Sequence, residues 1–248
     1  MANFFQNFPL LGYRFGNEES QTLFQNLTTY VAVIDEIKGN TDFYATGYIR
    51  DGERPDTLSF SLYGTTDYYW TFYFLNDDIR ESGWPLTEQQ ILPRAKQDYP
   101  NKVFTTQGDI STRFFTGQNI TGLTSGSVGK IIKKNIDLGQ IIVSTEEDFL
   151  DDELVGVDDD TIQTVRLTNI TDQYNAVHHY EDTDGVYKDI DPSTFIPGAS
   201  ELIPITNLDR IRLRNEELRT IDVFKPDVAP QISSEFNKLL RSSQNASS

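Results

Sequence analysis

Apolar and polar positions near the N-terminus follow the two-residue alternation and β-branched composition of strands. Residues 27–37 (LTTYVAVIDEI) and 42–50 (DFYATGYIR) are rich in Thr, Val, Ile and Tyr, which favour strands. The turn sequence Lys38-Gly39-Asn40 separates the two segments. The pattern therefore predicts an N-terminal β-hairpin that follows an aromatic-rich arm over residues 1–16.

The next segments carry signals for helices. Asp56 is a predicted N-cap of a helix that Gly64 ends. Residues 66–76 are ambiguous, because their types favour a strand while their length allows a buried helix. Thr87 begins a capping-box sequence that predicts a helix through about residue 98. Pro93 inside that span opposes the last prediction.

The middle and the end of the chain differ in character. Short apolar runs alternate with Gly- and Thr-rich turns from 105 to 175, and residues 130–144 predict two strands around a turn at 135–139. Residues 161–170 predict another strand of the same barrel-like or sandwich-like insertion. Residues 218–224 then predict a strand, and apolar residues at helical spacing predict a helix after Asp227, with 242–248 as a disordered tail.

These elements predict an α+β protein with four parts. The parts are an N-terminal arm and hairpin (1–52), a helical unit (53–107), an inserted acidic all-β domain (108–175) and a C-terminal strand–helix segment (176–248).

Charge is concentrated in one stretch of the chain. The chain has 38 acidic and 21 basic side chains, and residues 141–191 hold fifteen of the acids against Arg166 and Lys188. A net charge of −17 opposes non-specific binding to nucleic acid. The acidic loops at 146–160 could hold calcium, but their spacing matches no known pattern and favours solvated loops.

Several function classes find little support in the residues. The chain has no Cys and no apolar run of about 18 residues, so we expect no thiolate chemistry and no membrane helix. Its first residues do not resemble a secretory signal, which predicts a protein kept in, or assembled in, a cytosol. His178 and His179 are the only imidazoles, and as neighbours in a strand they should point to opposite faces and share no metal ion. We therefore expect no enzyme activity, cofactor or metal, although a pair of catalytic carboxylates stays open.

Two clusters are candidates for protein contacts. Seven aromatic residues fall between Tyr63 and Phe74, a density that favours a core or a protein interface over a platform for sugars or bases. Arg210, Arg212 and Arg214 alternate, so on a strand they would line one face. That face is predicted to be salt-bridged or to dock on an acidic protein surface.

Residues 48–78 (YIRDGERPDTLSFSLYGTTDYYWTFYFLNDD) combine Arg-Pro-Asp, Tyr-Gly, Tyr-Trp and Asn in a specific order. This pattern resembles the baseplate wedge family of contractile-tailed phages, of the gene-fifty-three type. The opening NFFQNFPLLGYRFG and the closing segments at 178–199 and 215–240 are similar to the versions in marine cyanophages. The resemblance covers about 1–107 and 176–241 and leaves out the β-insertion.

Residues 55–93 also resemble a LysM module, with a closing ILP at 91–93. The resemblance implies a helix over 66–76 and, within the wedge family, a packing role for the module. It implies a structural wedge subunit of the virion baseplate, assembled in the host cytoplasm, whose partners are other wedge proteins, with no nucleic acid, membrane or small-molecule substrate. The alternatives are a LysM module that binds peptidoglycan and a tail-associated hydrolase. The predicted interface residues are Phe4, Phe5, Phe8, Tyr13, Phe15, Tyr68, Trp70, Arg210, Arg212 and Arg214.

Overall fold

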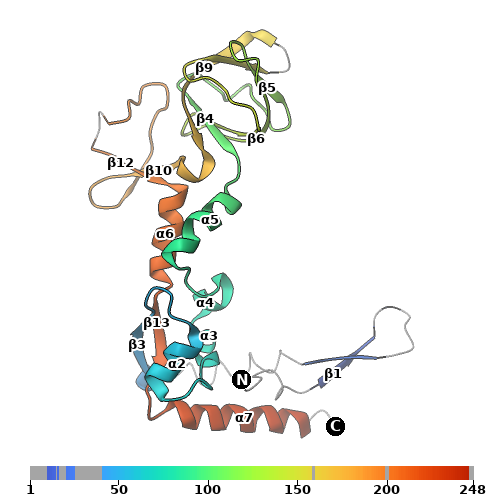
Figure 1. The fold of residues 1–248 in the computed structure, drawn as a ribbon, viewed down its shortest axis with the longest axis vertical. Helices are drawn as coiled ribbons and strands as arrows, with labels where there is room; N and C mark the ends of the chain where they lie inside the picture. The colour runs from blue at the N-terminus through green and yellow to red at the C-terminus, as the bar shows by residue number, and fades with distance from the viewer. Residues whose placement is uncertain are drawn as a thin grey trace. The chain divides into compact units, whose positions relative to one another are not determined.

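The computed structural model describes residues 10–14, 16, 21–25, 41–157, 160–198 and 201–245 (Figure 1). The chain divides into two compact units. Unit 1 comprises residues 1–87 and 215–248, and unit 2 comprises residues 88–214. Both units mix helices with strands, which confirms the predicted α+β class.

Unit 1 is built on an antiparallel strand pair whose members lie far apart in the sequence. Strand β3 (Tyr44–Tyr48), which follows the short helix η2 (Thr41–Phe43), pairs with β13 (Thr220–Phe224). Helices α2 (Pro55–Tyr63), α3 (Trp70–Leu75) and α4 (Asp77–Ser82) lie between the two strands in the sequence, and α7 (Ala229–Asn245) follows β13. Unit 2 is therefore an insertion between α4 and β13.

Helix α2 begins and ends at local signals. Pro55 occupies the first turn, and the Thr57 hydroxyl accepts a hydrogen bond from the backbone N–H of Arg54 at 3.0 Å. Gly64 ends the helix with φ +72°, as predicted. The N-cap prediction was wrong, because Arg54 is the N-cap and Asp56 lies in the first turn, where its carboxylate pairs with Arg54.

Helix α3 joins the two hydrophobic clusters of unit 1. Trp70 and Phe74 belong to the first cluster, in which Trp70 stacks on Phe236 of α7 with ring centroids 4.7 Å apart. Phe72 belongs to the second cluster, which also holds Ile221 of β13. A helix with buried side chains on both sides needs no amphipathic pattern. This explains why the segment 66–76 reads ambiguously and settles it as helical over 70–75.

Unit 2 contains a closed six-stranded barrel. Its strands are β4 (Lys102–Thr106), β5 (Asn119–Gly122), β6 (Val128–Asn135), β7 (Gln140–Ser144), β8 (Leu154–Val157) and β9 (Asp160–Asp172). They are joined in the order β4-β7-β6-β5-β8-β9, and neighbouring strands are antiparallel. The strands predicted within 130–144 and 161–170 are confirmed. The barrel nevertheless begins before residue 108, because β4 closes it.

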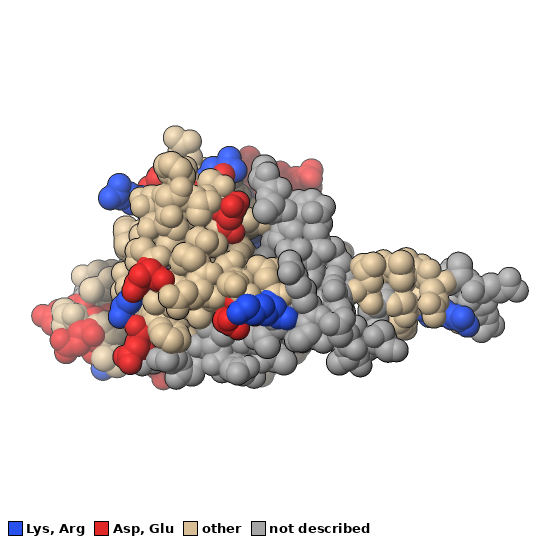
Figure 2. Space-filling view, turned by 90° about the horizontal axis from the view of Figure 1, so that it is seen from below, with Lys and Arg blue, Asp and Glu red and all other residues tan. Residues whose placement is uncertain are grey.

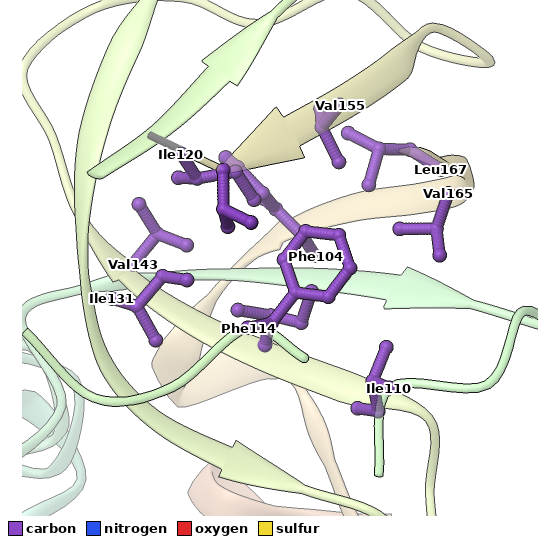
Figure 3. Packing of buried hydrophobic residues seen from close by; sticks show 11 residues of the cluster. Phe104, Ile110, Phe114, Ile120, Ile131, Val143, Val155, Val165 and Leu167 are labelled. Atoms are coloured by element: carbon purple, nitrogen blue, oxygen red, sulfur yellow. The ribbon is translucent and has the colours of Figure 1, made fainter. Parts of the chain in front are cut away.

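The barrel interior is filled by apolar side chains. Phe104, Ile131, Val143 and Leu167 come from four different strands and point toward one another inside the barrel (Figure 3). Each is at most 1% exposed. Their burial removes apolar surface from water, which is the main stabilising contribution to a barrel of this size.

The rest of unit 2 comprises a helix, a small sheet and most of a second helix. Helix α5 (Glu88–Asp98) starts and ends as predicted, and η3 (Gln173–Asn175) follows the barrel. Strands β11 (Tyr187–Lys188), β10 (Val177–Glu181) and β12 (Ile203–Thr206) form a sheet in that order. Helix α6 (Asn207–Glu217) leads back toward unit 1. Residues 91–93, the closing ILP of the LysM-like pattern, are helical within α5, as the predicted helix through about residue 98 requires.

The N-terminal region differs in part from the prediction. A two-stranded hairpin is formed by β1 (Leu10–Tyr13) and β2 (Thr22–Gln25), inside the predicted arm and just beyond it. The predicted partner of the second strand, 27–37, lies outside the described residues. Strand β3, which lies within the second predicted strand, pairs with β13. At the other end, α7 continues to Asn245, so the prediction of a disordered tail from residue 242 was wrong.

Candidate functional site

The aromatic candidates of unit 1 lie in its core. Trp70 is only 7% exposed, and Tyr68 is half-buried with its ring edge-on to Tyr63. The Tyr63 hydroxyl donates to the backbone oxygen of Phe224 at 3.0 Å. Burial raises the pKa of Tyr63 to about 12, although hydrogen bonds partly offset that effect. The cluster is therefore a packed core with Tyr hydroxyls at its edge, and Trp70 offers little surface to a partner.

The hairpin β1–β2 is the described part of the predicted arm. Leu10 is 64% and Leu23 is 63% exposed, and the register of the pair puts both on one face. Tyr13 and Phe24 are also exposed, and the hairpin presents mostly uncharged side chains (Figure 2). An isolated two-stranded hairpin is marginally stable in water and cannot bury such side chains by itself. The other predicted arm residues, Phe4, Phe5, Phe8 and Phe15, lie outside the described residues.

The three basic candidates lie on a helix, so the prediction of one strand face was wrong. Arg210, Arg212 and Arg214 are exposed on α6. At helical spacing Arg210 and Arg214 share a side, while Arg212 turns away and lies 3.8 Å from Asp209. The helix is capped reciprocally, because the Thr206 hydroxyl and the Asp209 carboxylate accept from each other's backbone N–H groups at 3.1 Å.

Asn215 and Arg219 of unit 1 form a clamp, which is a set of hydrogen bonds and ion pairs. It links the segment where the chain leaves unit 1 to the segment where the chain returns. The Asn215 side chain accepts from the backbone N–H of Leu86 at 2.6 Å and donates to its oxygen at 3.0 Å. Arg219, 5% exposed, donates to Leu86 oxygen at 3.2 Å and pairs with Asp51 and Glu216 at 2.9 and 3.0 Å. Burial alone would lower the Arg219 pKa, but the two carboxylates outweigh it and the pKa is raised.

No sequence signal singled out this clamp. Asn215 and Arg219 bond mainly to backbone oxygens and to distant carboxylates, so their partners cannot be inferred from nearby residues. Asn76 makes a similar link, donating to Asp222 oxygen and accepting from its N–H, both at 2.8 Å. These side chains stabilise β13 against helices that precede unit 2 in the sequence.

The two histidines lie together, which corrects the prediction of opposite faces. A bulge between Val177 and His179 adds a residue to β10 opposite β12. The Nδ1 atoms of His178 and His179 are 3.0 Å apart, and His179 Nε2 lies 2.8 Å from Glu181. One Nδ1 must donate and the other accept, so the pair carries at most one positive charge.

The surroundings of the pair oppose a bound cation. Burial and then the positive charges of Arg210, His179 and Lys133 lower the pKa of His178. In the described part of the chain, no group of three or more His, Cys, Asp or Glu side chains is placed to hold a metal ion.

One residue of the acidic loops has a clear structural role. Glu153 is 4% exposed and accepts backbone N–H groups of Leu150, Ser125 and Thr124 at 2.7, 3.0 and 3.2 Å. Burial raises its pKa, but these hydrogen bonds outweigh burial and the pKa is lowered. Glu153 thus fixes two barrel loops as a carboxylate.

Comparison with protein-family models and with curated protein sequences finds no match for the chain. Within the described residues, no helix combines the length and the apolar character that crossing a membrane requires. The resemblance to the wedge family therefore depends on the residues quoted above.

Proposed function

We propose that the protein is a structural subunit of the baseplate wedge of a contractile phage tail. It holds neighbouring wedge proteins together during assembly and during the rearrangement that accompanies contraction. The observation that carries the proposal is the hairpin β1–β2, which exposes Leu10 and Leu23 on one face. An element of this kind gains stability when it is laid on a partner, because the contact buries apolar side chains that the hairpin cannot bury itself.

The architecture of unit 1 supports the same proposal. A LysM-like module is closed by a strand, and β13 supplies a strand that pairs with β3 after helices α2, α3 and α4. The closing strand then follows unit 2 instead of preceding it. The clamp of Leu86 by Asn215 and Arg219 keeps the module closed around the insertion. A module with so many internal bonds suits a packing element between subunits.

The hairpin provides the test of this function. We expect the double variant Leu10→Ser/Leu23→Ser to stay folded, because both side chains are exposed, but to be lost from particles made in infected cells. Phe60→Ser is the matched control, since Phe60 is 61% exposed on α2 and should tolerate the change. Quantitative mass spectrometry of purified particles measures the incorporation of each variant. Equal incorporation of the double variant and the control contradicts the proposed role of the hairpin.

The second candidate is peptidoglycan binding by the LysM-like unit, which the order of β3, α2, α3 and β13 favours. Replacing Trp70 would not test it, because that residue is buried. Exposed Phe60 is the better probe. Saturable binding to purified peptidoglycan that is lost in Phe60→Ser, with unchanged thermal unfolding, would favour this candidate over the structural one.

A further inference from the structure

Unit 2 contains a pocket of about 460 Å³ outside the barrel core. Strands β4 and β9 provide one side of it through Thr105, Asn169 and Thr171. Tyr180 of β10 and Phe195 of the loop that follows β11 provide another side. The volume lies within the range of about 300–1,000 Å³ that is usual for small-molecule sites.

The lining carries no charge. Among the described residues that line the pocket there is no Asp, Glu, Lys, Arg or His, and the polar ones are Thr, Asn, Gln and Tyr. This is unusual in a chain with 38 acidic and 21 basic side chains. An ionic ligand would lose its hydration here without gaining a counter-charge, so the lining favours a neutral ligand.

Several polar groups at the pocket have no partner within the protein. In the described part of the chain, no hydrogen bond is made by the hydroxyl groups of Tyr180, Thr105 and Thr171 or by the side-chain amide of Asn169. Tyr180 is 8% exposed, so its ring is buried while its hydroxyl lacks a protein partner. The Tyr180 hydroxyl itself is not fully buried, so a ligand in the pocket can reach it and supply the hydrogen bond that the protein does not.

The site is held in shape by its surroundings. Gln140, which is 7% exposed, donates its amide to the backbone oxygen of Val177 at 2.9 Å, and this fixes the side chain. The Phe195 ring lies 4.8 Å from the Tyr180 ring, and the Phe195 N–H donates to Asp191 oxygen at 2.8 Å. A site whose walls are held in this way loses little entropy when it binds a ligand.

An extended peptide is disfavoured as the ligand. β4 and β9 are each paired on both sides within the barrel, and β10 is paired on both sides within its sheet. Strand β7, which contributes Gln140, is also paired on both sides. The remaining strand at the pocket is β12, an edge strand that contributes Pro204, a residue without an N–H group. A peptide would therefore find only this short edge, interrupted by Pro204, with which to pair its backbone.

We propose that this pocket binds a neutral saccharide, without chemical conversion. Hydroxyl groups of a sugar can both donate to and accept from Tyr180, Thr105, Thr171 and Asn169, and apolar sugar faces can pack on the aromatic rings. The proposal does not depend on the proposed function of the whole protein, because it concerns residues of unit 2 alone.

Ligand-observed NMR with the full-length protein tests the proposal. The probes are maltotriose, cellotriose and tri-N-acetylchitotriose at millimolar concentration, with trigalacturonic acid as the charged comparison. We expect at least one neutral probe to bind and the charged one not to bind. Tyr180→Phe, which removes one hydroxyl group, should weaken binding about three- to tenfold, and Asn169→Ala should do the same.

Two control variants, Tyr187→Phe in unit 2 and Phe60→Ser in unit 1, show whether a loss of binding is specific to the pocket. Tyr187→Phe also removes a hydroxyl group, but Tyr187 is exposed on β11 and does not line the pocket. Its binding should equal that of the unchanged protein. The proposal is overturned if no neutral probe binds, if trigalacturonic acid binds as well as the neutral probes, or if Tyr180→Phe and Asn169→Ala bind normally. Loss of binding in Phe60→Ser alone would place the sugar on unit 1 and would also overturn it.

Discussion

Replacing Glu153 by Gln tests how the barrel of unit 2 is held together. The carboxylate accepts from the N–H of Leu150 through Oε1 and from the N–H groups of Thr124 and Ser125 through Oε2. Gln keeps the size of the side chain but replaces one oxygen by an NH₂ group. The orientation of the Gln side-chain amide that loses the fewest hydrogen bonds keeps its oxygen toward Thr124 and Ser125. Its NH₂ group then faces the N–H of Leu150.

The expected loss follows from these contacts. A buried N–H group left without an acceptor costs about 1–3 kcal/mol. The hydrogen bonds that remain, from the N–H groups of Thr124 and Ser125 and from the Ser125 hydroxyl, change from charged to neutral. Together this costs roughly 1–2 kcal/mol. We therefore expect Glu153→Gln to reduce the free energy of unfolding by about 2–5 kcal/mol. That is a large part of the roughly 5–15 kcal/mol that stabilises an ordinary domain.

Hydrogen–deuterium exchange of the full-length protein measures this loss in the barrel itself. The slowest amides of β5 and β8 should lose protection by about 30-fold or more. Glu146→Gln is the control, because Glu146 is exposed and makes no hydrogen bond in the described structure. It removes the same charge and should change stability by less than about 0.5 kcal/mol. Equal protection in the two variants would refute the role assigned to Glu153.

The same variant predicts a pH dependence. The pKa of Glu153 in the folded protein lies below its ordinary value of 4.5. Its contribution to stability is therefore complete above about pH 4.5 and is lost as the pH falls through the lower, folded pKa. Other carboxylates with a lowered pKa change the stability of the unchanged protein and of Glu153→Gln by the same amount, so they cancel in the difference. The stability difference between the unchanged protein and Glu153→Gln should shrink in acid, and a constant difference down to low pH contradicts this.

Two further predictions concern packing. Trp70→Ala removes the ring that stacks on Phe236. We expect the free energy of unfolding, measured in urea, to fall by about 3–5 kcal/mol. A fall of less than about 1 kcal/mol would contradict a core role for Trp70. Gly139 and Gly126 both have positive φ, but an added Cβ would lie 2.3 Å from Thr106 oxygen at Gly139 and near no atom at Gly126. Gly139→Ala should therefore lower the melting temperature clearly more than Gly126→Ala, and equal shifts would refute the close approach.

The elements that depend on neighbouring residues could be predicted from the sequence. Gly64 ends α2 with an N–H that donates to Phe60 oxygen one turn earlier, and Thr87 directly precedes α5, so both signals are local in the sequence. The same kind of signal was present at α6, where Thr206 and Asp209 have the spacing of a capping box. The alternation of the arginines favours a strand face, but Arg210 and Arg214, four residues apart, also fit one side of a helix.

Long-range pairing could not be predicted in this way. Strand β3 pairs with β13, whose Phe224 lies opposite Tyr44, and no local pattern identifies a partner so far along the chain. The local pattern predicted only a pairing between sequence neighbours, with 27–37, which lies outside the described residues. The bulge that brings His178 and His179 together is another non-local feature, because simple alternation places adjacent side chains on opposite faces. In the candidate site, exposure of Tyr13 and burial of Trp70 likewise depend on tertiary packing.

The position of the protein in an intact virion tests the central proposal most directly. On this proposal the chain is encoded by a phage, and a cryo-electron microscopy map of that phage's particle would show the location and contacts of the protein. The proposal predicts density for the six-stranded barrel in the baseplate wedge, with the β1–β2 hairpin laid against a neighbouring subunit and Leu10 and Leu23 buried there. A baseplate without this barrel, or a hairpin exposed to solvent in the assembled wedge, would contradict it.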